Sequence, residues 1–515
     1  MPISQPFPEQ LKEFENELKT QKSAASTTPT HPPSNIHQLN STPPPPTTTT
    51  KPKRHWLKRL IFGFVGIFLI LALTIGVILS ELHFVVLNRF VSDIPPIDDS
   101  DLQLQLVNIP QEENAFYDFK KIEGYLNSSN YPEEVSKKVL DHLKGKVWDE
   151  NFAQETLTKN GEALVVFDEA VNKQFQDPRY ADPKKVLSNV LNPSLKLDPL
   201  KVLKIARLST LRALYLAHQG KEMEALNEAV KSAEIGQKIQ ESQVGTLDYL
   251  LGFAMKDNGL RTIQKIVATS KLPPEMLLQD AQYIEKFKNN EEGLKTAFKL
   301  EYALAVNAID DTTNGISDEL KNKYSDKFDP NRFQNSLKNN FVWQPNKTKA
   351  ISADTIRAGI NEVKKPCKQT TELEIKMPIN FATSSSRLKS ELDKLLFLTT
   401  ENLAGKSMYV ALASRYNFYV QNGKRCQENF LVSATQIMLA LKAYNLDTGG
   451  YPTTLDQLVP KYIPKVYEDP FDGKPIKYSP TKKIIYSIGK DRIDSGGSDG
   501  DDWLTMPDPT FKIEF

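Results

Sequence analysis

The chain has 515 residues, enough for two or three domains of ordinary size. Its formal net charge is +1 at pH 7, with 65 Lys and Arg against 64 Asp and Glu. A protein that binds nucleic acid usually carries a clear basic excess, so this balance argues against nucleic acid as a partner. The two cysteines have no neighbouring histidines, which argues against a zinc site.

Residues 60–79 form an uninterrupted apolar segment of the length that spans a bilayer. Acidic residues follow this segment and basic residues precede it, which predicts that the N-terminus is cytoplasmic. The basic residues are Lys51, Lys53, Arg54, Lys58 and Arg59. We therefore expect one transmembrane helix over residues 57–82 in the cytoplasmic membrane. The lipid bilayer is then a partner, and the C-terminal bulk is periplasmic or extracellular. The Pro- and Thr-rich residues 1–55 are expected to form a disordered cytoplasmic tail.

The region after this segment has the apolar spacing of helices. Residues 100–310 predict an α-helical extracytoplasmic domain, because apolar residues recur there every three or four positions. Within it, residues 201–220 and 222–240 predict an antiparallel hairpin that partly resembles a tetratricopeptide unit, with Gly220 ending the first helix. Further helices are expected over residues 244–269, 274–288, 290–309 and 387–421.

Residues 311–386 are polar and contain several prolines, which predicts an irregular insertion with short strands around 371–382. A helical connector is expected over residues 387–425. Ser386, at the end of the insertion, and Lys389 of the connector form an S-x-x-K pair, but the partner motifs of that enzyme class are missing. We therefore expect that the chain is not an enzyme, and no small-molecule substrate is indicated.

Cys367 and Cys426 are the only cysteines of the chain. A bridge between them would close a loop of about 60 residues and contribute about 3–4 kcal/mol in the chain-entropy model. Two independent thiols agree equally well with the sequence, so the pairing stays open.

Residues 426–515 begin with an amphipathic helix that should end at Gly449 and Gly450. A turn follows at Asp469-Pro470-Phe471-Asp472-Gly473. The short apolar runs 476–478 and 484–488 then predict a small antiparallel hairpin.

This order of motifs resembles a known family. The strings ALKAYNLDTGGYPTTLDQLVPKYIP, DPFDGKPIKY and IIYSIGKDRIDSGG, within residues 426–503, resemble the soluble domain of the major pseudopilins of type II secretion systems. The resemblance implies a long helix packed on a small antiparallel sheet, closed by a loop that binds calcium. The expected fold class is therefore α+β, with one transmembrane helix, a mostly α-helical extracytoplasmic domain and a C-terminal pilin-like helix on a small antiparallel sheet.

The acidic loop supports calcium from its own composition. Five aspartates lie between residues 491 and 502, and calcium takes carboxylate and carbonyl oxygens in flexible geometry. The candidate metal residues are Asp491, Asp494, Ser498, Asp499, Asp501 and Asp502. By resemblance, Asp491 matches the first acidic ligand and Asp501 the later one, with Asp499 and Asp502 as rivals. A solvated loop that binds nothing remains the alternative. An EF-hand fits less well, because Ile493 occupies a ligand position.

Two hypotheses of function follow. The first is a non-enzymatic protein with a structural or interaction role in the cell envelope or in a secretion or pilus-like system, with proteins of that system as partners. The second is a tethered helical module that binds a peptide, a glycan or a protein, with the pilin-like unit only stabilising it. An extracytoplasmic enzyme is a remote third alternative. Ordinary filament assembly is disfavoured, because Phe68 stands where a pilin has a glutamate.

Overall fold

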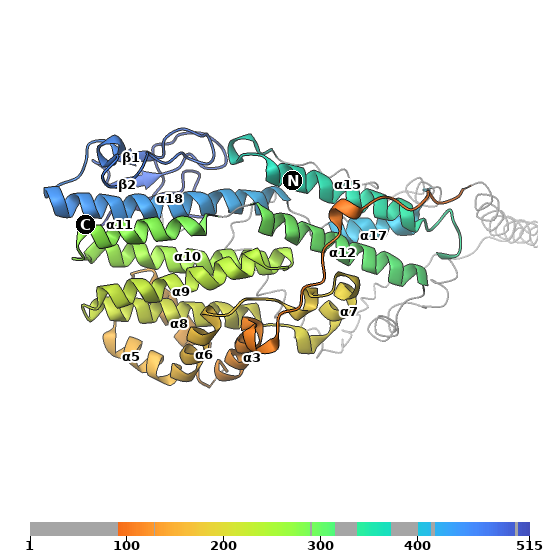
Figure 1. Ribbon diagram of the computed structural model, residues 1–515, viewed down its shortest axis with the longest axis horizontal. Coiled ribbons are helices and arrows are strands. Elements are labelled where there is room, and N and C mark those ends of the chain that lie inside the picture. Colours follow the sequence, from red (N-terminus) through yellow and green to blue (C-terminus); the bar gives the residue numbers. More distant parts are fainter. Residues whose placement is uncertain are drawn as a thin grey trace, which may run out of the picture. The chain divides into compact units, whose positions relative to one another are not determined.

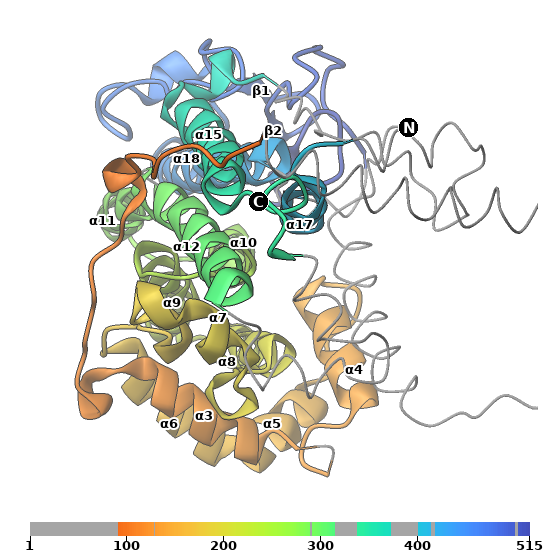
Figure 2. The same cartoon turned by 90° about the vertical axis from the view of Figure 1, so that its right-hand side faces the viewer.

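The computed structural model describes residues 91–127, 129–288, 291–314, 337–371, 400–413, 418–499 and 503–515. The chain divides at Ser92 into two units, and all that follows concerns the second unit, Asp93–Phe515. This unit is mostly helical and carries one small antiparallel sheet (Figures 1 and 2).

The first helices of the unit are α3 (Ala115–Tyr125), α4 (Glu133–Leu143), α5 (Glu150–Lys159), α6 (Gly161–Val171) and α7 (Val186–Leu191). Next come α8 (Pro199–His218), α9 (Glu222–Glu241), α10 (Thr246–Thr269), α11 (Pro274–Tyr283) and α12 (Glu292–Asn314). The last helices are α15 (Pro345–Lys364), α17 (Leu403–Ala413) and α18 (Phe418–Thr448). The strands are β1 (Lys477–Ser479), β2 (Ile484–Tyr486) and β3 (Thr510–Lys512).

The helices α8, α9, α10 and α18 lie one above the other, with the sheet beyond α18 (Figure 1). The predicted hairpin over residues 201–240 is confirmed as α8 and α9, and Gly220 adopts φ +76° between them. The helices α9 and α10 approach closely because glycines face each other. A Cβ on Gly252 would lie 2.6 Å from the carbonyl oxygen of Gly236. We call α3 to α12 the helical body.

Helix α18 is the central element of the C-terminal part. Apolar residues such as Leu431 and Ile437 are fully buried, and so are most positions between Phe418 and Ala443. Both α10 and α11 pack on this helix. The helix ends as predicted: Gly449 has φ +76° and donates its N–H to the carbonyl of Asn445, a conformation that glycine adopts at little cost.

The sheet has the order β1–β2–β3, with both pairs antiparallel. The predicted hairpin is confirmed as β1 and β2, with Tyr478 opposite Ile485. The third strand was not expected, and it pairs Phe511 with Ile485. The ring of Phe511 stacks on Phe430 of α18, with centroids 5.6 Å apart, so the sheet packs on this helix through its third strand.

The expected single-pass membrane arrangement is corrected. Across the described residues, no helix is both long and apolar enough to cross a bilayer. The longest of them, α18, carries Lys424, Arg425, Glu428 and Lys442, which bilayer hydrocarbon would not accommodate. The expected transmembrane helix over residues 57–82 and the tail over 1–55 lie outside the described residues. The membrane location is therefore not retained.

The predicted irregular region contains a regular helix, α15, of 20 residues. Pro345 was interpreted as a helix breaker, but it occupies the first turn, where a proline loses no intrahelical hydrogen bond. The expected strands around residues 371–382 fall almost entirely outside the described residues, as do Ser386 and Lys389. The expected boundary between residues 425 and 426 falls inside the continuous helix α18.

Candidate metal centre

The acidic loop begins directly after the sheet, at Gly489. This glycine has φ +67°, and a Cβ there would lie 1.8 Å from the carbonyl oxygen of Pro507. Only glycine therefore lets the start of the loop pass against the segment that leads into β3. As a result, residues 491–499 are folded over Pro507–Pro509 and the first residue of β3.

Asp508 holds the loop in place through hydrogen bonds to its backbone. Its side chain is fully buried, and its Oδ2 accepts hydrogen bonds from the backbone N–H groups of Ser495 and Gly497, each at 2.9 Å. The N–H of Asp508 donates to Oγ of Ser498 at 3.2 Å, and the N–H of Ser498 donates to Oγ1 of Thr510 at 2.9 Å. The loop is thus wrapped around one buried carboxylate.

The second oxygen of this carboxylate is not satisfied. Oδ1 of Asp508 is buried and has no hydrogen-bond partner among the described residues. A buried oxygen without a partner costs free energy, and more so when it belongs to a charged group. A cation bound at this oxygen would remove that cost.

The six candidate ligands predicted from the sequence do not all point to one site. Asp494 is turned toward the sheet: its Oδ1 accepts from the N–H of Gly496 at 3.0 Å and from the hydroxyl of Tyr486 at 3.2 Å. Its Oδ2 lies 3.3 Å from Nζ of Lys477. Burial alone would raise the pKa of Asp494, but these hydrogen bonds and the Lys477 charge hold it below its usual value.

The other predicted ligands differ in exposure and in the contacts that they make. Asp491 is exposed and accepts from the N–H of Ile493 at 3.1 Å, which only shapes a turn. Asp499 is exposed, and Ser498 contacts Asp508 directly. Asp501 and Asp502 lie outside the described residues. Within the described ranges, no three His, Cys, Asp or Glu side chains converge as a metal cluster.

The oxygen set therefore fits a hard cation better than a soft one. Asp508 supplies one carboxylate oxygen that has no hydrogen-bond partner among the described residues, and the hydroxyl of Ser498 lies 3.2 Å from the backbone nitrogen of Asp508. Gly496 and Gly497, with φ of +80° and +86°, turn the backbone tightly around the carboxylate. Calcium accepts carboxylate, hydroxyl and carbonyl oxygens in variable number, so these groups would hold it in part.

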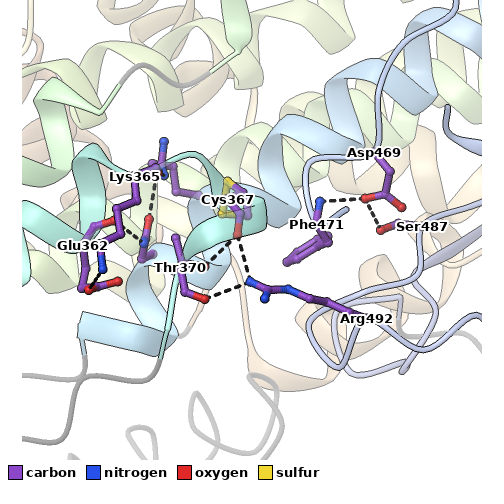
Figure 3. The surroundings of a disulfide bond; sticks show 11 residues. Glu362, Lys365, Cys367, Thr370, Asp469, Phe471, Ser487 and Arg492 are labelled. Carbon is purple, nitrogen blue, oxygen red and sulfur yellow. Dashed lines mark hydrogen bonds and ion pairs between the residues drawn. A yellow bond between two sulfur atoms is a disulfide. The ribbon is translucent and has the colours of Figure 1, made fainter. Parts of the chain in front are cut away.

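A disulfide bond lies beside the turn that precedes β1. Cys367, just after α15, is bonded to Cys426 of α18, and the two pack with Phe471 and Ile488 (Figure 3). The sequence left open whether Cys367 and Cys426 are paired, and the structure pairs them. This bond fixes the end of α15 to α18 beside the turn at residues 469–473.

The carboxylate of Asp469 holds that turn against β2. It is fully buried, and its Oδ1 accepts from the N–H of Phe471 and the hydroxyl of Ser487, each at 2.9 Å (Figure 3). Its Oδ2 accepts from the N–H of Ile488, also at 2.9 Å. Burial raises the pKa of Asp469, although these hydrogen bonds act in the opposite direction. Because both of its oxygens are satisfied, Asp469 is a structural residue.

No protein-family model, no curated protein and no solved structure matches this chain.

Asp508 is the residue that the sequence reasoning missed. The prediction counted aspartates only between residues 491 and 502, because five of them fall within these twelve residues. Asp508 is separated from them by residues 503–507 and stands between Pro507 and Pro509, two residues before the start of a strand that was not predicted. A lone aspartate in the tripeptide Pro-Asp-Pro after an acidic loop was the available signal.

Proposed function

We propose that this chain is a non-enzymatic interaction protein of a secretion or pilus-like system, and that its pseudopilin-like C-terminal part binds calcium. The observation that carries the calcium proposal is the buried carboxylate of Asp508. One of its oxygens holds the acidic loop, and the other has no hydrogen-bond partner among the described residues.

The charge of the loop supports the same proposal. Four aspartates besides Asp508 and Asp494 belong to residues 491–502, and Arg492 is the only basic residue among them. Carboxylates so close together repel one another unless a cation offsets their charge. Calcium is the physiological cation that best tolerates an irregular set of oxygen ligands.

The arrangement of α18 supports an interaction role over a filament role. In this chain, the side of α18 that does not face the sheet is covered by α10 and α11. Gln436 of α18 donates to the carbonyl of Ala281 at 2.9 Å, and Thr435 accepts from Gln264 at 2.8 Å. A helix buried within its own chain cannot offer that side to a second copy.

Thermal unfolding of the purified full-length chain tests the calcium proposal. Calcium should raise the melting temperature above that measured in a chelator, because a ligand at a hundredfold excess over its Kd stabilises by about 2.7 kcal/mol. The shift should disappear in Asp508→Asn, which keeps the shape of the side chain and removes its charge. Asp456→Asn, which removes an exposed carboxylate outside the loop, should keep the shift.

An identical melting temperature of the wild-type chain in calcium and in chelator would contradict the calcium proposal. Crosslinking in cells tests the assembly proposal. Crosslinks from the C-terminal part to subunits of a secretion or pilus-like machine support it, whereas crosslinks only within the chain contradict it.

A further inference from the structure

The acidic loop is attached to the rest of the chain at both of its ends. At the C-terminal end, Trp503 is 2% exposed, and its indole Nε1–H donates to Oδ1 of Asp257 in α10 at 2.9 Å. Its ring packs on Phe511 of β3, with centroids 5.2 Å apart, and on Phe430 of α18. Trp503 therefore joins the sheet, α18 and the helical body.

The backbone of the next residue, Leu504, is also bound to a helix. The carbonyl oxygen of Leu504 accepts from Nε2 of Gln427 in α18 at 3.1 Å. Two consecutive residues after the loop are thus bound to two different helices. Asp257 lies one residue from Lys256, which forms a fully buried ion pair with Glu428 of α18. The position of Asp257 is therefore fixed by the packing of α10 on α18.

At the N-terminal end, Arg492 is the anchor. Its guanidinium donates to the carbonyl oxygens of Thr370 at 2.9 Å and of Cys367 at 3.4 Å (Figure 3). Arg492 has φ +59°, a conformation unusual for a residue with a side chain, which the anchoring contacts help to hold. Cys367 is itself held by its disulfide to α18.

From these contacts we infer that the helical body and the segment after α15 together set the calcium affinity of the loop, with Trp503, Asp257 and Arg492 as positioning residues that do not touch the ion. This inference rests on the proposed calcium site at Asp508. Anchors at both ends already limit the conformations of the loop, so the loop loses less conformational entropy when an ion binds at Asp508. A loop without these anchors would lose more conformational entropy on binding and would therefore bind calcium more weakly.

The coupling is reciprocal. If docking of Trp503 strengthens calcium binding, then calcium strengthens docking of Trp503 by the same factor. Calcium bound at Asp508 should therefore slow hydrogen exchange of the Trp503 indole and of the backbone at residues 503–504. These groups belong to the contact with the helices and do not belong to the ion site, so their protection reports the coupling directly.

Calcium titration of the full-length chain by calorimetry tests the inference. Trp503→Phe keeps an aromatic ring and removes the N–H donor, and Asp257→Leu removes the acceptor. Each should weaken calcium binding about tenfold, the effect of losing one hydrogen bond to a charged group. The double variant should bind no more weakly than either single variant, because both remove the same contact.

Arg492→Gln should also weaken calcium binding. The matched control is Trp148→Phe, since the ring contacts of Trp148 among the described residues are with His142 and His218, both in the helical body. This control should bind calcium with wild-type affinity.

The outcomes separate the two proposals. Absence of calcium binding to the wild-type chain sinks the proposed function. Wild-type binding with unchanged affinity in Trp503→Phe and Asp257→Leu overturns the inference alone. If an anchor variant fails to fold, hydrogen exchange of the wild-type chain decides, because unchanged protection of residues 503–504 with and without calcium also overturns it.

Discussion

The ammonium nitrogen of Lys256 in α10 lies 2.7 Å from Oε1 of Glu428 in α18, and both side chains are fully buried. Lys256 also donates to the side chain of Gln237 in α9 and to the carbonyl oxygen of Phe287. Glu428 accepts from Gln240 of α9 at 3.4 Å. One buried ion pair and its hydrogen bonds therefore join α18 to α9 and α10 of the helical body.

Removal of one partner of this pair should be strongly destabilising. Lys256→Met leaves the carboxylate of Glu428 buried without its counter-charge, which costs about 3–5 kcal/mol. The double variant Lys256→Met with Glu428→Met should recover most of that loss, because two apolar side chains replace the pair without leaving a buried charge. Urea unfolding measures all three variants. Equal losses of stability in the single and the double variant would refute this reading of the pair.

The contact of α9 with α10 should not tolerate a methyl group at its glycines. Gly252→Ala places a Cβ 2.6 Å from the carbonyl oxygen of Gly236, so the helices must move apart, at a cost of about 1–3 kcal/mol. Gly124→Ala in α3 is the matched control, because a Cβ there meets nothing within 4 Å. This control should be stabilising by about 0.5–1 kcal/mol, since alanine favours helix over glycine. Thermal melting distinguishes the two signs.

Asp280 of α11 gives a prediction with a defined pH dependence. Burial raises the pKa of Asp280 to about 6, and its Oδ2 has no hydrogen-bond partner among the described residues. In an unfolded chain an aspartate has a pKa of about 3.9, so the folded chain binds the extra proton between these two values. The contribution of Asp280 to stability is therefore most favourable below the unfolded pKa and is lost as the pH rises through 6.

Asp280→Asn should accordingly be more stable than wild type at pH 7. We expect about 1–2 kcal/mol, because the side chain is partly solvated and its full shift must be discounted. The advantage should shrink as the pH falls toward 4, where the wild-type carboxyl is neutral as well. Urea unfolding of both proteins across this range measures the difference. A difference that does not change with pH would rule out titration of Asp280 as its cause.

The disulfide predicts a response to reductant. Reduction of the Cys367–Cys426 bond, which spans 59 residues, should cost about 3–4 kcal/mol in the chain-entropy model. It should also loosen the anchor of Arg492 on Cys367 and Thr370. Melting temperatures with and without reductant measure the effect. The Cys367→Ser, Cys426→Ser double variant should not respond to reductant, and an equal response in that variant would show that the effect has another origin.

Local features of the fold were predictable from the sequence. The end of α18 at Gly449 and the pairing of β1 with β2 follow from residues that are close in the chain. Features that join distant residues were not predictable. The strand β3 has only three residues and forms because β2 offers it an edge. Lys256 and Glu428 appear in the sequence as ordinary charged positions of two helices, and only their packing makes them a pair.

The candidate site was predictable in part for the same reason. The acidic loop is recognisable because five aspartates fall within twelve residues, and this composition led to the hypothesis of a calcium site. The residue that holds the loop, Asp508, lies after Trp503 and accepts hydrogen bonds from backbone N–H groups, so its role depends on how the loop folds back over it. Asp494 was predicted as a calcium ligand from its position in the loop, but its carboxylate forms an ion pair with Lys477 and accepts a hydrogen bond from Tyr486 of the sheet.

Direct measurement of bound calcium tests the central claim. Equilibrium dialysis of the full-length chain against radioactive calcium gives the number of ions per chain without reference to stability. We expect one bound ion for wild type, one for Asp456→Asn and none for Asp508→Asn. Failure of the wild-type chain to retain calcium, or equal retention by Asp508→Asn, would contradict the account.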